Sequence, residues 1–181
     1  MMARPGYKTL EGFKSKGLSN KNRDHYTIQN IDMVAEAIQN LKNYYGSEKV
    51  ILVGHSGGAA TAGIIISRHP SLIDSTVLIS CPCNVSKWRS SPKKKEGGVR
   101  ELGINHLLHI DGLIKSLKKK VGIIIGELDE NTFPKLSIDY FELLKKNNVQ
   151  SELLLINVAH SFWHIYTNKE AIELGKSLVN K

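Results

Sequence analysis

A serine set between glycines follows a short apolar run in this 181-residue chain. Gly54-His55-Ser56-Gly57-Gly58 matches the pattern G-x-S-x-G, which is typical of a nucleophilic serine on a sharp strand-to-helix turn. The alternative is a glycine-rich phosphate cradle, but neither G-K-[ST] nor G-x-G-x-x-G accompanies the turn. We therefore take Ser56 as the candidate nucleophile. Strand and helix approach closely at such a turn, so we expect side chains at 54 and 58 to clash.

A serine hydroxyl needs a base to take its proton, and acidic residues and histidines follow two later apolar runs. Residues 121–125 lead into three carboxylates: Glu127, Asp129 and Glu130. Residues 151–156 lead into His160, with His164 four residues further on. In an open parallel sheet the carboxyl ends of the strands share one edge, where ligands bind. The spacing predicts serine, acid and histidine at that edge, with the choice among the three carboxylates and between the two histidines open.

The apolar patterning predicts strands that alternate with helices, which is typical of a parallel α/β sheet. The expected strands are 50–53, 75–80, 121–125 and 151–156, and the expected helices are 26–45, 57–69, 101–118, 134–146 and 168–180. The run 50–53 is continuously apolar, so we expect a strand buried on both faces. We predict an open, mostly parallel sheet with helices on both faces. One domain spans residues 1–181, with 82–118 as a candidate cap.

The composition excludes several classes of protein. Apolar residues make up 41% of the chain and charged residues 23%, which excludes wholesale disorder. No apolar run reaches the roughly 18 to 20 residues of a membrane helix, and the first residues lack the apolar core of a signal peptide. Cys81 and Cys83 are too close to form a disulfide framework, so we expect them to serve packing in a reducing cytoplasm.

The net charge of +8 raises the question of nucleic acid. The densest basic runs are Lys93–Lys95 and Lys118–Lys120, the second at the end of an expected helix. Neither run is interleaved with the aromatic residues that stack on single strands, so we interpret both as solvated surface. The cysteine pair has no second cluster at metal-ligand spacing, and His106 with His109 lacks a third ligand. We therefore expect neither nucleic acid, metal nor organic cofactor.

Together, the motifs resemble the three catalytic blocks of the α/β-hydrolase superfamily. The matching segments are Gly54 to Gly58, Gly126-Glu127-Leu128-Asp129, Ala159-His160-Ser161-Phe162 and, upstream, Arg4-Pro5-Gly6-Tyr7, which is similar to a segment after the superfamily's fourth strand. The resemblance implies Ser56 as nucleophile, His160 as base and Asp129 as acid. It also implies that the Gly57 N–H holds the oxyanion. The expected reaction cleaves a small ester, thioester or amide through an acyl-enzyme.

The sequence departs from the superfamily at its beginning. The loop that supplies the second oxyanion donor lies upstream of the segment that resembles Arg4 to Tyr7, so we expect a shortened hydrolase with one donor. We also expect the strand at 50–53 to form an exposed sheet edge that promotes self-association. The alternatives to an active enzyme are an impaired remnant and a module that binds a partner by strand addition.

Overall fold

The computed structural model describes residues 5–9, 11–17, 26–90 and 120–179. Several expectations fall outside these residues, among them the helix at 101–118, the Lys93–Lys95 run and most of the candidate cap at 82–118. The assignment of the whole chain to one domain also stays a prediction.

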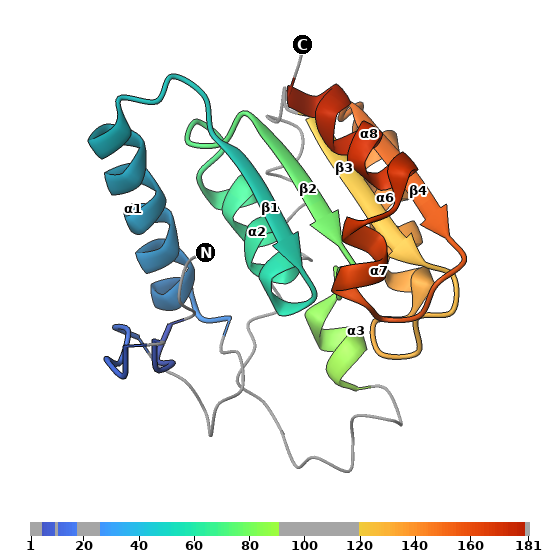
Figure 1. Ribbon diagram of the computed structural model, residues 1–181, viewed down its shortest axis with the longest axis horizontal. Helices are drawn as coiled ribbons and strands as arrows, with labels where there is room; N and C mark the ends of the chain where they lie inside the picture. The colour runs from blue at the N-terminus through green and yellow to red at the C-terminus, as the bar shows by residue number, and fades with distance from the viewer. Residues whose placement is uncertain (1–4, 10, 18–25, 91–119, 180–181) are drawn as a thin grey trace.

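The four predicted strands and the longer helices follow one another along the chain as expected, but the short helices at 85–89 and 162–166 were not predicted (Figure 1). They are α1 (Ile28–Tyr45), β1 (Ile51–His55), α2 (Gly57–Arg68), β2 (Ser75–Ile79), α3 (Val85–Arg89), β3 (Lys120–Gly126), α6 (Pro134–Lys146), β4 (Ser151–Ile156), α7 (Phe162–Tyr166) and α8 (Lys169–Val179). One expectation was wrong in detail. Lys120 is the first residue of β3 and does not end a helix. The strand begins one residue before the apolar run 121–125.

The four strands form one parallel sheet in the order β1-β2-β3-β4. The register aligns the strand ends: His55 lies beside Ile79, Ile79 beside Ile124, and Gly126 beside Ile156. The segments that follow β1, β3 and β4 therefore leave the sheet at a common edge. The predicted parallel α/β fold is confirmed.

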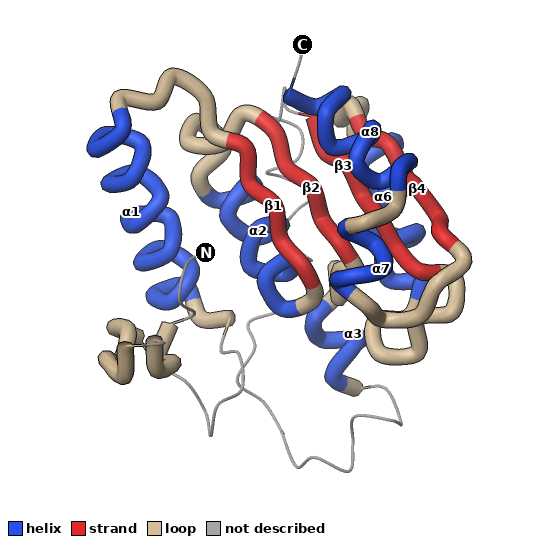
Figure 2. The backbone as a smooth tube through the Cα atoms, in the orientation of Figure 1, coloured by secondary structure: helices blue, strands red, loops and turns tan. Residues whose placement is uncertain are grey.

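Helices cover both faces of the sheet (Figure 2). Alternate strand residues point to opposite faces, so Leu78 and Ile123 join a core with α1, α2 and α6. Val77, Ile79 and Ile124 join a second core with α7 and α8 on the other face. The two cores account for the Val, Ile and Leu residues of β2 and β3, which are buried almost throughout.

At the edge of the described sheet, β1 is buried on one face rather than on two. Leu52 packs against the core that contains α2. Val53 pairs with Val77 and shares its face, yet 57% of Val53 is exposed, because α8 contacts β2, β3 and β4. The expectation of two buried faces was wrong at this residue. Apolar composition does not reveal how far along the sheet a covering helix reaches.

Cys81 and Cys83 form a disulfide in the structure. They lie just after β2, and both are almost fully buried. This corrects the expectation of reduced cysteines that serve packing. Sequence spacing alone did not show that the turn holds the two Cα atoms 5.0 Å apart, a separation at which a disulfide can form.

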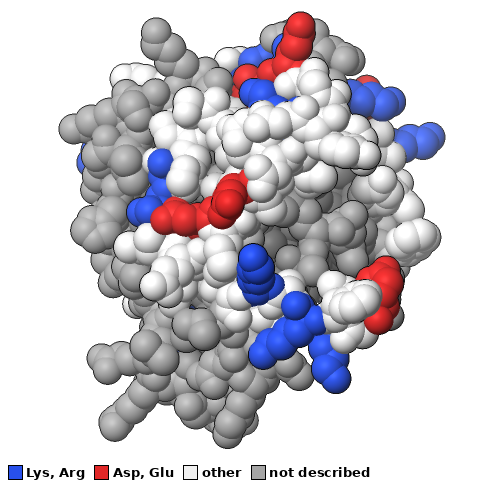
Figure 3. All heavy atoms as spheres, turned by 90° about the vertical axis from the view of Figure 1, so that its left-hand side faces the viewer, with Lys and Arg blue, Asp and Glu red and all other residues white. Residues whose placement is uncertain are grey.

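Two surface properties bear on partners. Within the part of the chain that the structure describes, no helix has the length and apolar character needed to cross a membrane. Figure 3 shows basic and acidic side chains interspersed with uncharged residues on the face that looks out from the left side of Figure 1. The absence of nucleic-acid binding stays a prediction.

We predict that the exposed side of β1 promotes self-association that grows with ionic strength, because salt screens the repulsion from the +8 net charge. Val53→Lys should reduce this association, since a charge on an edge strand opposes strand pairing. Light scattering at low and high salt measures the effect. Tyr44→Lys, at an 81% exposed position on α1, adds the same charge away from the sheet and should have a smaller effect. Equal effects of the two variants would contradict a role for the β1 edge.

Candidate active site

Ser56 occupies a strained turn between β1 and α2. Its φ of 52° and ψ of −120° lie where residues other than glycine are rarely found, at a cost of about 1–3 kcal/mol. The Ser56 N–H donates to the Ile79 carbonyl at 2.8 Å, and its own carbonyl accepts from Ala59 and Ala60. The Ser56 side chain caps no N–H group of α2. The backbone thus fixes the turn without using the hydroxyl.

Gly54 is required by the close approach of β1 and α2. A β-carbon there would lie 2.7 Å from the Ala59 nitrogen and closer still to the Gly58 carbonyl oxygen. The expected clash is therefore confirmed at this position. At Gly58 the expectation was wrong, because a β-carbon would meet no described atom within 4 Å. The tight contact is made by the backbone at 58, not by a side chain.

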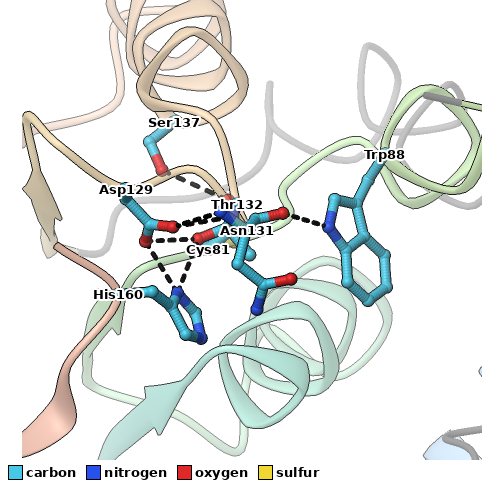
Figure 4. Close-up of polar contacts among 7 residues, drawn as sticks. All are labelled: Cys81, Trp88, Asp129, Asn131, Thr132, Ser137 and His160. Carbon is cyan, nitrogen blue, oxygen red and sulfur yellow. Dashed lines mark hydrogen bonds and ion pairs between the residues drawn. The ribbon is translucent and has the colours of Figure 1, made fainter. Parts of the chain in front are cut away.

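Asp129 is held in a buried turn just after β3. Its Oδ1 accepts backbone N–H groups from Asn131 at 2.9 Å and Thr132 at 2.8 Å. Its Oδ2 accepts the Thr132 hydroxyl and the His160 Nδ1, both at 2.7 Å. Figure 4 shows the Thr132 side chain and the imidazole ring both facing the Asp129 carboxylate.

Electrostatics keep Asp129 ionised despite its burial. Burial by itself raises the pKa of this carboxyl, but the hydrogen bonds from His160 and Thr132 outweigh it and lower the pKa to about 2, from an ordinary value of 3.8. At neutral pH the carboxylate has no proton to donate, so the proton between Asp129 and His160 sits on Nδ1. This leaves Nε2 of the neutral ring as the nitrogen that can accept a proton.

A second glycine allows the Asp129 turn and the His160 loop to meet. A β-carbon at Gly126 would overlap the Val158 carbonyl oxygen and lie 3.0 Å from that of Ala159. The Leu128 N–H donates to the same Val158 carbonyl at 3.1 Å. The backbone contact therefore places the carboxylate and the imidazole within hydrogen-bond distance.

His55 connects the serine turn to this pair. Its ring centroid lies 5.1 Å from that of His160. Burial, and to a smaller extent the proximity of His160, lower the pKa of His55 although Asp129 opposes the shift. A neutral His55 adds no positive charge beside His160. His55 therefore packs against the His160 ring.

The remaining candidates take other positions. Glu127 and Glu130 are exposed, as is His164 on α7. Gly57 opens α2, so its N–H is one of the first helical N–H groups, which have no acceptor within the helix.

Among the residues described, no group of three or more His, Cys, Asp or Glu side chains could hold a metal ion. His106 and His109 lie outside the described residues.

The sequence reasoning missed Thr132 and the steric role of Gly126. The pattern Asp-x-x-Thr could have suggested Thr132, because Asp side chains commonly accept N–H groups two and three residues on. The role of Gly126 had no local signal, since its neighbours Val158 and Ala159 are more than thirty residues away in the chain.

Comparison with known proteins agrees with this architecture. A family model described as the alpha/beta hydrolase fold matches residues 12–98, a range that contains the Ser56 turn but neither Asp129 nor His160. No curated protein matches the sequence. The predicted α/β-hydrolase-like fold is confirmed by the family model and by similar solved structures.

Three of these solved structures are described by their TM-score, identity and coverage. An esterase of Pyrococcus furiosus has a TM-score of 0.68 at 20% identity, covering 93% of this chain and 67% of its own. Est1E of Butyrivibrio proteoclasticus, with ferulic acid bound, has a TM-score of 0.66 at 16% identity, covering 96% of this chain and 76% of its own. The acylaminoacyl peptidase of Pyrococcus horikoshii has a TM-score of 0.65 at 12% identity, covering 83% of this chain and 26% of its own. Similarity at these identities establishes the fold.

We predict that Asp129→Asn destabilises the protein in a pH-dependent way. Because folding lowers the pKa of Asp129 from 3.8 to about 2, the ionised carboxylate contributes about 2 kcal/mol of stability above about pH 4, which is lost as the pH falls toward about 2. Urea unfolding of wild type and variant should show a difference at neutral pH that shrinks over this range. Asp139→Asn, which breaks exposed pairs with Lys87 and Lys135, should cost less than about 1 kcal/mol. A pH-independent difference for Asp129→Asn would contradict an electrostatic origin.

Proposed function

We propose that this chain, which has the α/β-hydrolase fold, is a serine hydrolase that cleaves an ester, thioester or amide. The observation that carries the proposal is the hydrogen bond between the buried Asp129 carboxylate and His160 Nδ1, at the sheet edge where Ser56 occupies its strained turn. The contact of His55, the residue before Ser56, with the His160 ring further supports a common site.

In the proposed reaction Ser56 Oγ attacks the substrate carbonyl carbon while His160 Nε2 takes the hydroxyl proton. The Gly57 N–H stabilises the oxyanion of the tetrahedral intermediate. When the intermediate collapses, the leaving group departs with the proton from His160 and the acyl group stays on Ser56. Water then attacks the acyl-enzyme while His160 takes a proton from that water. When this second intermediate collapses, His160 gives the proton to Ser56 Oγ, and the acid product and free Ser56 are released.

Asp129 acts in this scheme through His160. Its carboxylate holds the Nδ1–H and stabilises the positive charge that the ring gains when it accepts the serine proton. His160 is 22% exposed at its side chain whereas Asp129 is fully covered, so the ring can reach substrate and the carboxylate is shielded from water. Shielding strengthens the interaction between the two charges.

The similar structures include an esterase and peptidases, which is consistent with carbonyl substrates of either kind. We propose a small-molecule ester, thioester or amide as the substrate, without metal or organic cofactor. Cytoplasmic location remains part of the proposal, although the Cys81–Cys83 disulfide removes the argument drawn from reduced cysteines.

A second candidate function follows from the exposed edge of the described sheet. With Val53 exposed on β1, a partner chain could add a strand there. In this alternative the site is an impaired remnant, and the chain acts as a binding module. Activity of Ser56 distinguishes the two candidates.

We predict that Ser56 is the serine labelled by a fluorophosphonate probe, because His160 activates its hydroxyl. Mass spectrometry of the labelled protein should locate the adduct on Ser56, and Ser56→Ala should abolish labelling. Ser56→Ala should also lower esterase turnover on the order of 10⁴-fold or more. Ser161→Ala, which removes the serine that caps α7, should leave the labelling in place. An adduct on Ser161 or Ser80, or no adduct at all, would contradict the proposed nucleophile.

We further predict that Asp129→Asn lowers kcat/KM on the order of 10³–10⁴-fold, because the amide cannot hold the same His160 tautomer. Glu127→Gln and Glu130→Gln remove exposed carboxylates from the same turn and should change kcat/KM by less than about threefold. An ester hydrolysis assay on the three purified variants measures the difference. Loss of activity in Glu127→Gln with none in Asp129→Asn would transfer the acid role to Glu127.

A further inference from the structure

Thr132 contacts both members of the acid–histidine pair. Its hydroxyl donates to Asp129 Oδ2 at 2.7 Å and lies 3.2 Å from His160 Nδ1. The residue is fully buried, so water does not compete for the hydroxyl. Figure 4 shows its side chain pointing to the carboxylate edge that also faces the imidazole.

The proton count fixes the direction of these bonds. The hydroxyl has one proton, and the ionised carboxylate is a stronger acceptor than the imidazole Nδ1, which already carries a proton. Thr132 therefore donates to Asp129 Oδ2, and His160 donates its Nδ1–H to the same oxygen. One carboxylate oxygen thus shares its negative charge between two donors.

The turn does not depend on this hydroxyl for its shape. The backbone N–H groups of Asn131 and Thr132 already bind the other carboxylate oxygen, Oδ1. The indole N–H of Trp88, a residue of α3, donates to the Asn131 carbonyl at 2.7 Å. These three hydrogen bonds fix the shape of the turn. The Thr132 hydroxyl therefore affects Asp129 Oδ2, the oxygen that faces His160, rather than the turn itself.

We propose that Thr132 is a positioning residue, whose hydroxyl orients Asp129 Oδ2 toward His160 and moderates the hold of that oxygen on the protonated imidazole. Its importance for turnover rests on the proposed function. Without the hydroxyl, Oδ2 keeps His160 as its single donor and attracts the imidazolium more strongly. The ring then stays protonated to higher pH, and a smaller fraction of the enzyme has a free base.

The charged surroundings of the imidazole are the same with and without the Thr132 hydroxyl. The titratable contacts that the structure gives for the His160 ring are Asp129, from the turn after β3, and His55, from the end of β1. His164, four residues along the same segment, is exposed. Because replacing Thr132 alters none of these groups, a shift in the titration of His160 reports the loss of the hydroxyl itself.

The test uses NMR titration of the imidazole protons in the whole chain, with the His160 signal assigned by its loss in His160→Gln. Thr132→Val keeps the shape of the side chain and removes the hydroxyl, whereas Thr132→Ser keeps the hydroxyl. Ser137→Ala is the matched control, because Ser137 is also fully buried and its hydroxyl donates to the Cys81 carbonyl at 3.2 Å. The readout requires no turnover, so it is independent of the probe experiment on Ser56.

In Thr132→Val we expect the midpoint of the His160 titration to move to higher pH by about half a unit or more. Thr132→Ser should titrate like the wild type, and Ser137→Ala should leave the midpoint in place. In an Asp129→Asn background the effect of Thr132→Val should vanish, because the charge on which the hydroxyl acts is gone. If the enzyme is active, the acid limb of the kcat/KM profile should move with the midpoint.

An unchanged or lowered midpoint in folded Thr132→Val would overturn the proposal, as would an equal shift in Ser137→Ala. Thr132→Ala provides a second variant without the hydroxyl in case the valine does not fit. If both variants fail to fold while Ser137→Ala folds, Thr132 is a structural residue and the proposal is wrong. Failure of Ser56 to react with the probe would remove the proposed function without altering the titration result.

Discussion

Close contact of backbone segments at the carboxyl edge of the sheet is the constraint on which the site depends. At the end of β1, Gly54 allows α2 to begin so near the strand that a β-carbon would touch Ala59. At the end of β3, Gly126 allows the segment after β4 to approach equally closely. In both places the absent side chain lets one backbone rest on another. Polar side chains carried by the two turns are then set at fixed positions relative to the sheet.

The buried negative charge of Asp129 is stabilised because hydrogen-bond donors surround the carboxylate. An unpaired carboxylate at the depth of Asp129 would be strongly disfavoured. Four hydrogen bonds, two from the backbone and two from side chains, satisfy its oxygens and keep it ionised. The same bonds determine which nitrogen of His160 carries the proton. Geometry and protonation state at the site are therefore two results of one set of contacts.

The two faces of the described sheet differ in how far the helices cover them. On one face, α2 and α6 pack against the strands together with α1, whereas on the other face α8 contacts β2, β3 and β4 and leaves Val53 exposed. The Ser56 turn follows the strand with the least coverage. The strain at Ser56 must therefore be supported mainly by α2 and by the bond to the Ile79 carbonyl of β2.

The sequence by itself determined the order and type of the strands and the longer helices, because hydrophobic period and turn residues are local signals. The short helices α3 and α7 were missed, because five residues are too few to show a helical period. The helix at 134–146 and the strand at 151–156 agree with α6 and β4 to the residue. The sequence also indicated which strand ends carry Ser56, Asp129 and His160, since each motif directly follows an apolar run that predicts a strand. Which carboxylate meets the histidine was decided by the buried turn that hides Asp129 and leaves Glu127 and Glu130 in solvent. The Thr132 contact, the ring of His55 against His160, the need for Gly126 and the Cys81–Cys83 disulfide likewise came from the tertiary structure. Each of these depends on a distance through space that packing sets, and residue types and spacing along the chain do not encode such distances.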